Sequence, residues 1–161
     1  MIKLIAILTM VVDHVGIFLL PQYTTVLRAI GSMAFPLFAW MIVEGRYRTS
    51  NLKKYLQNLL FFAAISEPVY MLMYPGTNQY NAIFTLFWGL FLICAYERFG
   101  RFIFLGLLPL FHFDVISCYV VLIFLFYFAR GKNNIIIAGS VAFFLFVSTW
   151  GPDYVLFGLL F

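Results

Sequence analysis

Seven ionisable side chains lie inside long apolar stretches of the sequence or at their ends. A charged residue near the centre of a membrane span costs at least about 2.5–3.5 kcal/mol, so it is rarely present without a role. In such a set, a histidine can act as a base, a carboxylate can orient it, and a cation or an amide can stabilise an oxyanion. This chemistry suits proton abstraction from a nucleophile, and it equally suits proton-coupled transport. The residues are Asp13, His14, Arg28, Glu44, Glu67, His112 and Asp114.

Other chemistries lack their sequence signatures. The chain has no His/Cys cluster with zinc-ligand spacing, no phosphate-binding glycine loop and no Gly-x-Ser-x-Gly nucleophile elbow. Its two cysteines, Cys94 and Cys118, both lie in apolar runs, and we interpret them as packing residues. We therefore expect neither a metal site nor a nucleic-acid partner.

Structural roles are also open for the polar residues. Asp13 and His14 are adjacent, so on a helix they point about 100° apart and cannot readily hydrogen-bond to each other. His14 alone is compatible with a satisfied polar core residue. Arg28 is compatible with a structural ion pair to Asp13 or Glu67. Glu67 precedes Pro68, which we expect to break the helix, either for structural reasons or to shape a cavity.

The composition is that of a helical membrane protein. Of 161 residues, 65% are hydrophobic and only 10% are charged, with a mean hydropathy of +1.01. Soluble domains are about a quarter charged, so a water-soluble fold is excluded. The first apolar run is interrupted by Asp13 and His14 and has no small-x-small cleavage site, so we expect a first span and not a signal peptide. The sequence predicts an all-α, polytopic transmembrane bundle in one domain over residues 1–161.

About seven to eight spans are expected, several of them short for the roughly 17–25 residues that a crossing needs. The segment from Phe102 to Ala129 is long for one crossing and tight for two. The apolar runs are Leu4–Leu20, Val26–Glu44, Tyr55–Tyr74, Ala82–Tyr96, Phe102–Phe111, Val115–Ala129, Ile135–Trp150 and a stub from Tyr154.

Basic residues predict the orientation. When the loops are assigned alternately to the two sides of the membrane, nine of the ten Lys and Arg residues fall on one side, and Lys3 is one of the nine. Arg28 is the exception. The positive-inside rule makes that side cytoplasmic and places the N-terminus there. Glu44 then lies at the cytoplasmic boundary, where an interfacial role is expected. The basic loops serve as topology determinants, and they are also able to hold an anionic cofactor.

On this topology, most of the polar residues fall in the middle or outer half of the spans. They could converge on one buried polar pocket that opens outward. The residues concerned are His14, Arg28, Glu67, Asn81, Thr85, His112 and Asp114.

Several ordered motifs resemble those of the TraX family. The run LIAILTMVVDHVG at Leu4–Gly16 resembles the family's opening segment, and LRAIGSMAFPLFA at Leu27–Ala39 resembles its second segment. The tripeptide Val43–Gly45, the Thr49–Asn51 stretch and Lys54-Tyr55 resemble a third. ISEP at 65–68, NAIFT at 81–85, and Asp114 with Val120 and Leu122 extend the resemblance over about residues 3–130. Ser32 stands where the family often has Arg.

The resemblance implies a membrane acetyltransferase. TraX proteins acetylate the N-terminal residue of a conjugative pilin subunit with acetyl-CoA as donor. The family is similar to a broader group of transmembrane acyltransferases, in which an intramembrane histidine serves transfer from cytoplasmic CoA to an acceptor across the membrane. By this resemblance His14 is the catalytic residue and the location is the bacterial inner membrane. The expected partners are acetyl-CoA, a pilin-like subunit and the lipid bilayer.

The expected mechanism assigns a role to each group of residues. His14 takes a proton from the acceptor amine, directly or after forming an acetyl-imidazole. Asp13, Glu67 or Asp114 orients its ring, and the last two are favoured because they lie on other helices. Arg28 or Asn81 stabilises the tetrahedral oxygen.

Two binding regions complete this scheme. Arg46, Arg48, Lys53 and Lys54 hold the CoA phosphates. The substrate pocket is lined by Asn81, Thr85 and Asp114.

A competing interpretation is a non-enzymatic membrane protein. It would be a proton-coupled carrier or an assembly factor that holds a small hydrophobic pilin subunit. The sequence leaves the acceptor, the oligomeric state and the choice between direct transfer and an acetyl-histidine intermediate open.

Overall fold

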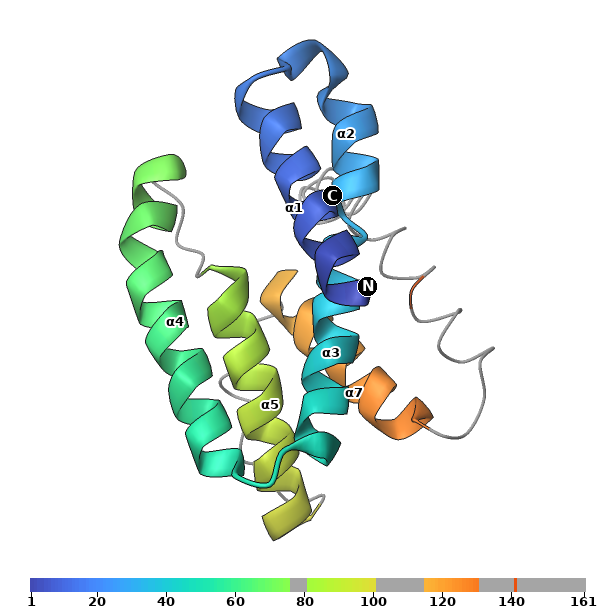
Figure 1. Cartoon of the computed structure of the whole chain (residues 1–161), viewed down its shortest axis with the longest axis vertical. Coiled ribbons are helices and arrows are strands. Elements are labelled where there is room, and N and C mark those ends of the chain that lie inside the picture. The colour runs from blue at the N-terminus through green and yellow to red at the C-terminus, as the bar shows by residue number, and fades with distance from the viewer. Residues whose placement is uncertain (76–80, 101–114, 131–140, 142–161) are drawn as a thin grey trace, which may run out of the picture. The chain divides into compact units, whose positions relative to one another are not determined.

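The computed structural model describes residues 1–75, 81–100, 115–130 and 141. Every element in these ranges is helical and none is a strand, which confirms the all-α class for this part of the chain (Figure 1). The elements are α1 (Ile2–Phe18), a 3-10 turn η1 (Pro21–Tyr23), α2 (Thr24–Gly31), α3 (Ala34–Arg48), α4 (Leu52–Met73), α5 (Ala82–Phe99) and α7 (Val115–Ala129).

The chain divides into two compact units. The first comprises residues 1–41 and 129–161, and the second comprises residues 42–128. Each unit is described by itself below. The single domain over residues 1–161 stays a prediction.

In the first unit, α1, η1 and α2 form a tight helical hairpin. Pro21 begins η1, where its fixed φ suits a helix start and its missing N–H is not needed. The Thr24 hydroxyl lies 2.9 Å from the Gly16 carbonyl and 2.8 Å from the Pro21 carbonyl, and it therefore ties the two arms together. A Cβ on Gly16 would lie 2.6 Å from Leu27 Cβ, so the glycine allows the close approach of α2.

A turn at Ser32 and Met33 separates α2 from α3 inside the predicted span Val26–Glu44, which lies within the candidate membrane span Pro21–Arg48. Pro36 provides the physical reason. It has no N–H to donate to the carbonyl four residues earlier, that of Ser32, and its ring would clash with this carbonyl in a continuous helix. At the same turn, the Ser32 hydroxyl donates to the Ala29 carbonyl at 2.8 Å.

The second unit has an apolar core contributed by α5, α7 and the last part of α3. Its largest fully buried side chains are Phe126, Leu90, Ile93, Ile123 and Val43. A Cβ on Gly89 would overlap Ile123, so α5 and α7 approach closely at this point. Small residues that permit such contacts are typical of helix pairs in membranes.

The helix α4 continues through Pro68, so the predicted break at this proline is wrong. Side-chain donors reach carbonyls of the turn that precedes the proline. The Ser66 hydroxyl lies 2.8 Å from the Phe62 carbonyl and 3.1 Å from the Ala63 carbonyl, and the Asn81 amide donates to Ala63 at 2.9 Å. None of these acceptors is the Ala64 carbonyl, to which a Pro68 N–H would have donated, so the Asn81 bond ties α5 to α4 without replacing the lost one.

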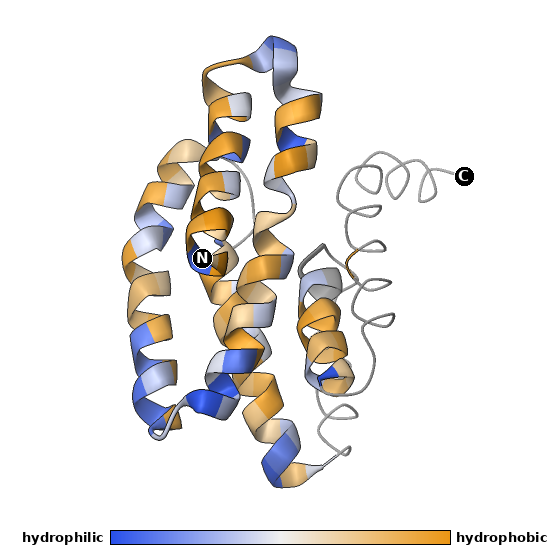
Figure 2. Ribbon diagram, turned by 45° about the vertical axis from the view of Figure 1, so that its right-hand side comes forward, coloured by the Kyte–Doolittle hydropathy of each residue, from blue (hydrophilic) through white to orange (hydrophobic). Residues whose placement is uncertain are grey.

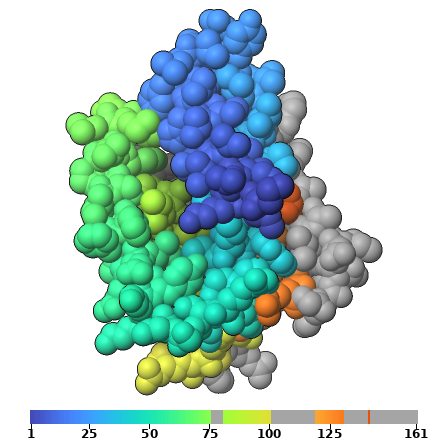
Figure 3. All heavy atoms as spheres, in the orientation of Figure 1, coloured from blue at the N-terminus to red at the C-terminus, as the bar shows by residue number. Residues whose placement is uncertain are grey.

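In the part of the chain that the structure describes, three helical segments are long and apolar enough to cross a bilayer: Pro21–Arg48, Leu52–Met73 and Ala82–Phe99. Many of their apolar side chains are exposed, as on α4, where Leu72 is 83% exposed. Figure 3 shows the side chains of α4 in green. Exposed apolar surface of this extent suits lipid and would cause aggregation in water. The chain is therefore a membrane protein.

The remaining topology stays a prediction. The helix α1 coincides with the expected first crossing at Leu4–Leu20. The runs Phe102–Phe111 and Ile135–Trp150, with the stub from Tyr154, lie outside the described residues. The total of seven to eight spans and the cytoplasmic N-terminus are accordingly not decided by the structure.

Candidate active site

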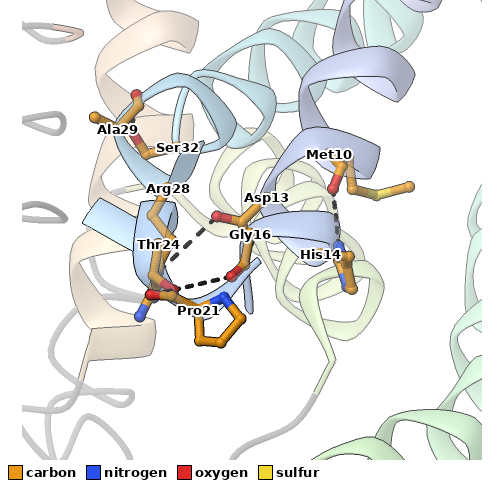
Figure 4. Close-up of polar contacts among 9 residues, drawn as sticks. All are labelled: Met10, Asp13, His14, Gly16, Pro21, Thr24, Arg28, Ala29 and Ser32. Atoms are coloured by element: carbon orange, nitrogen blue, oxygen red, sulfur yellow. Dashed lines mark hydrogen bonds and ion pairs between the residues drawn. The ribbon is translucent and has the colours of Figure 1, made fainter. Parts of the chain in front are cut away.

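Asp13 and Arg28 face each other across the α1–α2 hairpin (Figure 4). Arg28 Nε lies 3.9 Å from Asp13 Oδ1, and the two side chains are 58% and 26% exposed. The ion pair with Asp13 is thus one of the two structural pairings that we considered for Arg28. The guanidinium has five N–H donors, so most of them stay available for another oxygen.

Gly31 brings the backbone of α2 against Asp13. A Cβ at this position would lie 2.7 Å from both Asp13 Cα and Asp13 Oδ1. Only a glycine therefore allows this spacing of the two helices. Since Arg28 lies one turn before Gly31 on α2, the close contact also determines where Arg28 meets Asp13.

His14 points away from this ion pair. Figure 4 shows its ring on a different side of α1 from Asp13, as expected for adjacent residues of a helix. Its Nδ1 lies 2.8 Å from the Met10 carbonyl, one turn earlier, and the ring stacks on Phe18 at 6.3 Å between centroids. A carbonyl oxygen only accepts, so Nδ1 carries the proton. In a neutral ring, Nε2 then has a free lone pair.

A second polar cluster occupies the start of α5 in the second unit. Asn81 is the N-cap of this helix, and its Oδ1 accepts from the N–H groups of Ile83 and Phe84, each at 3.0 Å. Its amide nitrogen donates to Glu67 Oε2 at 2.6 Å and to Ser66 Oγ at 3.0 Å. Its backbone N–H also donates to Glu67 Oε2, at 3.2 Å. Asn81 is only 5% exposed, so the cluster links α4 to α5 in a buried setting.

The other carboxylate oxygen of Glu67, Oε1, is buried and has no hydrogen-bond partner among the described residues. A buried polar atom without a partner is costly. Asn81 donates twice to Oε2, and the N-terminus of α5 favours a negative charge beside it. Glu67 is therefore held by one oxygen, and the second is left for a hydrogen-bond donor.

Charged side chains gather at the opposite end of the second unit, where the hydrophilic ends of α3, α4 and α5 lie together (Figure 2). Arg46 donates twice to Glu97 Oε2, from Nε at 3.0 Å and from Nη2 at 2.5 Å. The Tyr127 hydroxyl donates to Glu97 Oε1 at 3.1 Å. Arg48 Nε donates to Glu44 at 3.0 Å on its own helix. Two of the four predicted phosphate ligands are thus already in ion pairs.

The predicted site residues are therefore distributed over both units. Asp13, His14 and Arg28 belong to the first unit, whereas Glu67 and Asn81 belong to the second. Their convergence on one pocket and the contact of Glu67 with the His14 ring stay predictions. His112 and Asp114 lie outside the described residues, and Thr85 is buried one turn after Asn81.

Three residues of these clusters were missed in the sequence. Ser66 was quoted only as part of ISEP, although a serine within four residues of a proline is a recognisable donor. Glu97 and Tyr127 were overlooked because Glu97 stands between Tyr96 and Arg98 at a span end, which indicates a solvated charge. Only the packing of α3, α5 and α7 brings them together.

Comparison with known proteins identifies the family. Residues 1–108 match the profile of the family described as "TraX protein". The chain belongs to the TraX family. Its matched part contains the hairpin with Asp13, His14 and Arg28, and also the Glu67–Asn81 cluster.

A curated relative is the "Probable fimbrial assembly protein FimC, serogroup H1" of Dichelobacter nodosus, 37% identical over 75 residues. The match covers 45% of this chain and 31% of the relative, so the chain spans about a third of that protein's length. No solved structure matches this TraX-family chain.

Proposed function

We propose that this TraX-family chain is a membrane-embedded acetyltransferase that moves an acetyl group from cytoplasmic acetyl-CoA to an acceptor amine. The observation that carries the proposal is the state of His14. Its Nδ1–H is bound to the Met10 carbonyl at 2.8 Å, so Nε2 is the free basic nitrogen. A histidine oriented through one nitrogen is prepared to exchange a proton at the other.

The proposed step is a balanced acyl transfer. His14 Nε2 takes a proton from the acceptor amine as the amine nitrogen bonds to the thioester carbon. The C–S bond then breaks, and the imidazolium returns the proton to the CoA thiolate. An α-amino group has a pKa near 7.7–8.0, so a histidine is an adequate base for it.

Arg28 is the proposed donor to the tetrahedral oxygen. Its side chain is 58% exposed although Asp13 lies beside it, so N–H groups remain for a substrate oxygen. Asp13 then acts as a positioning residue that holds the guanidinium at one place on α2. Preorganised donors of this kind are usually a large contribution to acyl-transfer catalysis.

The acceptor is proposed to be the N-terminal amine of a pilin-like subunit in the bacterial inner membrane. The printed name of the relative, a fimbrial assembly protein, supports a pilus-related role. Asn81 and Thr85, with Asp114, stay the proposed lining of the acceptor pocket. The proposal also requires a cytoplasmic N-terminus, because acetyl-CoA is a cytoplasmic donor.

The CoA phosphates are proposed to bind the basic end of the second unit. Arg46 is engaged by Glu97, and Arg48 is 81% exposed beside Glu44. Arg48, together with Lys54 in the first turn of α4, is therefore the better-placed cation for an incoming phosphate.

The test compares His14→Ala with Thr9→Val in purified protein reconstituted in liposomes. Thr9 also bonds to carbonyls of its own helix, those of Ile5 and Ala6, so this variant controls for the loss of such a bond on α1. Radiolabelled acetyl-CoA and a pilin-like peptide with a free N-terminus are the substrates. We expect His14→Ala to lower the rate by about 10²–10⁴-fold and Thr9→Val to have little effect. Equal rates for wild type and His14→Ala would exclude the assignment.

A second candidate function is a non-enzymatic assembly factor that holds a pilin-like subunit. The word "assembly" in the name of the relative favours it. In that case wild-type protein would bind the subunit and yield no acetylated peptide by mass spectrometry. His14→Ala would then assemble pilin as the wild type does.

A further inference from the structure

An open groove of about 410 Å³ runs between α4 and α5 in the second unit. One wall is formed by Leu52, Leu56 and Leu60, which recur every four residues on one stripe of α4. Phe87 and Phe91 form the other wall on α5. Leu60 and Phe91 are each 42% exposed, so the groove opens outward on a membrane-spanning hairpin.

The groove is charged at one end only. Lys53 lines it beside Leu52, in the first turn of α4. This turn contains no acidic residue, and Lys53 has no ion pair among the described residues. The N-terminus of a helix adds a partial positive charge at the same place. The groove is thus apolar along its length and cationic at its start.

We propose that this groove binds an anionic phospholipid, with one acyl chain between α4 and α5 and the headgroup phosphate on the Lys53 ammonium. In a bilayer no water fills an apolar groove of this kind, so hydrocarbon is the natural occupant. Lys53 lies at a span end, where a lysine side chain extends toward the headgroups. Arg48 and Lys54 then remain for the CoA phosphates.

From Leu52 to Leu60 the groove is about 12 Å long. An acyl chain is much narrower than a helix and can lie along this length.

The lining argues against the pantetheine arm of CoA. That arm carries two amide groups, which need hydrogen-bond partners when they are buried. The side chain of Gln57 is the one amide in the lining, beside leucines, phenylalanines and Lys53. A hydrocarbon chain requires no such partners.

The test uses native mass spectrometry of the full chain extracted from vesicles of phosphatidylcholine and phosphatidylglycerol in equal amounts. One lysine near an anionic headgroup changes affinity about fivefold. We therefore expect wild type to retain about fivefold more phosphatidylglycerol than phosphatidylcholine. Lys53→Gln should abolish this preference, and the control Lys54→Gln, a neighbouring lysine outside the groove, should keep it.

A second pair of variants tests the apolar part. Leu56→Trp fills the groove and should lower the total lipid retained, whereas Leu72→Trp on the exposed end of α4 should not. Equal retention by the two tryptophan variants would overturn the proposal, as would equal preferences in the two lysine variants. Release of the bound lipid by acetyl-CoA or by a pilin-like helix would also overturn it and assign the groove to that ligand.

Discussion

Replacing Asn81 by alanine should destabilise the protein far more than replacing Asn51, although both residues are helix N-caps. Asn51 caps the N-terminus of α4 and is exposed. Its side chain accepts one hydrogen bond, from the Lys54 N–H. Asn81 begins α5 and is 5% exposed. A comparison of Asn51→Ala with Asn81→Ala therefore separates the free-energy cost of losing a helix cap from that of losing a buried polar cluster.

The magnitude follows from the bonds that each variant removes. Loss of a cap costs about 1 kcal/mol, and this is the whole effect expected for Asn51→Ala. Asn81→Ala also removes the amide that donates to Glu67, Ser66 and Ala63. Buried groups left without partners cost about 1–3 kcal/mol, so the total for Asn81→Ala is about 2–4 kcal/mol. For a chain of this size the two variants should lower the apparent Tm by about 3 °C and about 5–15 °C, respectively.

The assay is thermal unfolding of purified protein in one detergent at one heating rate, because unfolding of membrane proteins is often irreversible and depends on scan rate. Asn81→Ser is the informative third variant. It keeps a capping oxygen but lacks the amide donors, so it should recover about 1 kcal/mol and no more. Equal shifts for Asn51→Ala and Asn81→Ala would refute the view that the Glu67–Asn81 cluster holds α4 and α5 together.

Two further predictions concern the remaining contacts. Gly31→Ala places a methyl group against Asp13, so overpacking should destabilise the protein by about 1–3 kcal/mol. The measurement is a lower Tm. An unchanged Tm would mean that α1 and α2 are not in this close contact. Glu97→Gln removes the negative charge that accepts two hydrogen bonds from Arg46 and leaves an uncharged amide in its place, so it should cost about 1–2 kcal/mol, measured in the same assay. Glu44→Gln is its control, since the partner arginine is 81% exposed and such pairs contribute less than about 1 kcal/mol; equal shifts for the two glutamine variants would contradict the difference.

The helical class and most helix positions were predictable because apolar length is a local property of the sequence. The predicted span Ala82–Tyr96 lies within α5, and Tyr55–Tyr74 nearly coincides with α4. The local effects of proline were harder to predict. Pro36 separates two helices and Pro68 does not, although the same missing N–H is involved. Pro36 lies in the first turn of α3, where a proline suits a helix start, whereas Pro68 lies inside α4.

The polar residues were predictable as a set, and their pairing was predictable only in part. Arg28 was given two possible partners, and the structure pairs it with Asp13, because α1 and α2 are neighbours in sequence and a short turn makes them antiparallel. The pairing of Glu67 with Asn81 was not foreseen. It depends on the register between α4 and α5, which periodicity does not determine.

Within the first motif of the family, the structure assigns packing contacts to Asp13 and Gly16 and leaves His14 outside them. Asp13 meets Arg28 and the backbone at Gly31, and Gly16 admits Leu27, so these residues explain how α1 and α2 fit together. The contacts of the His14 ring described here are with Met10 and Phe18 on its own helix.

The hairpin contacts therefore give no role to the His14 ring, and the proposed chemistry at Nε2 would supply one. A protein that only assembles pili should fail when Gly31→Ala disturbs the hairpin and should tolerate His14→Gln. An acetyltransferase should lose activity in both variants, and only Gly31→Ala should also lower the Tm.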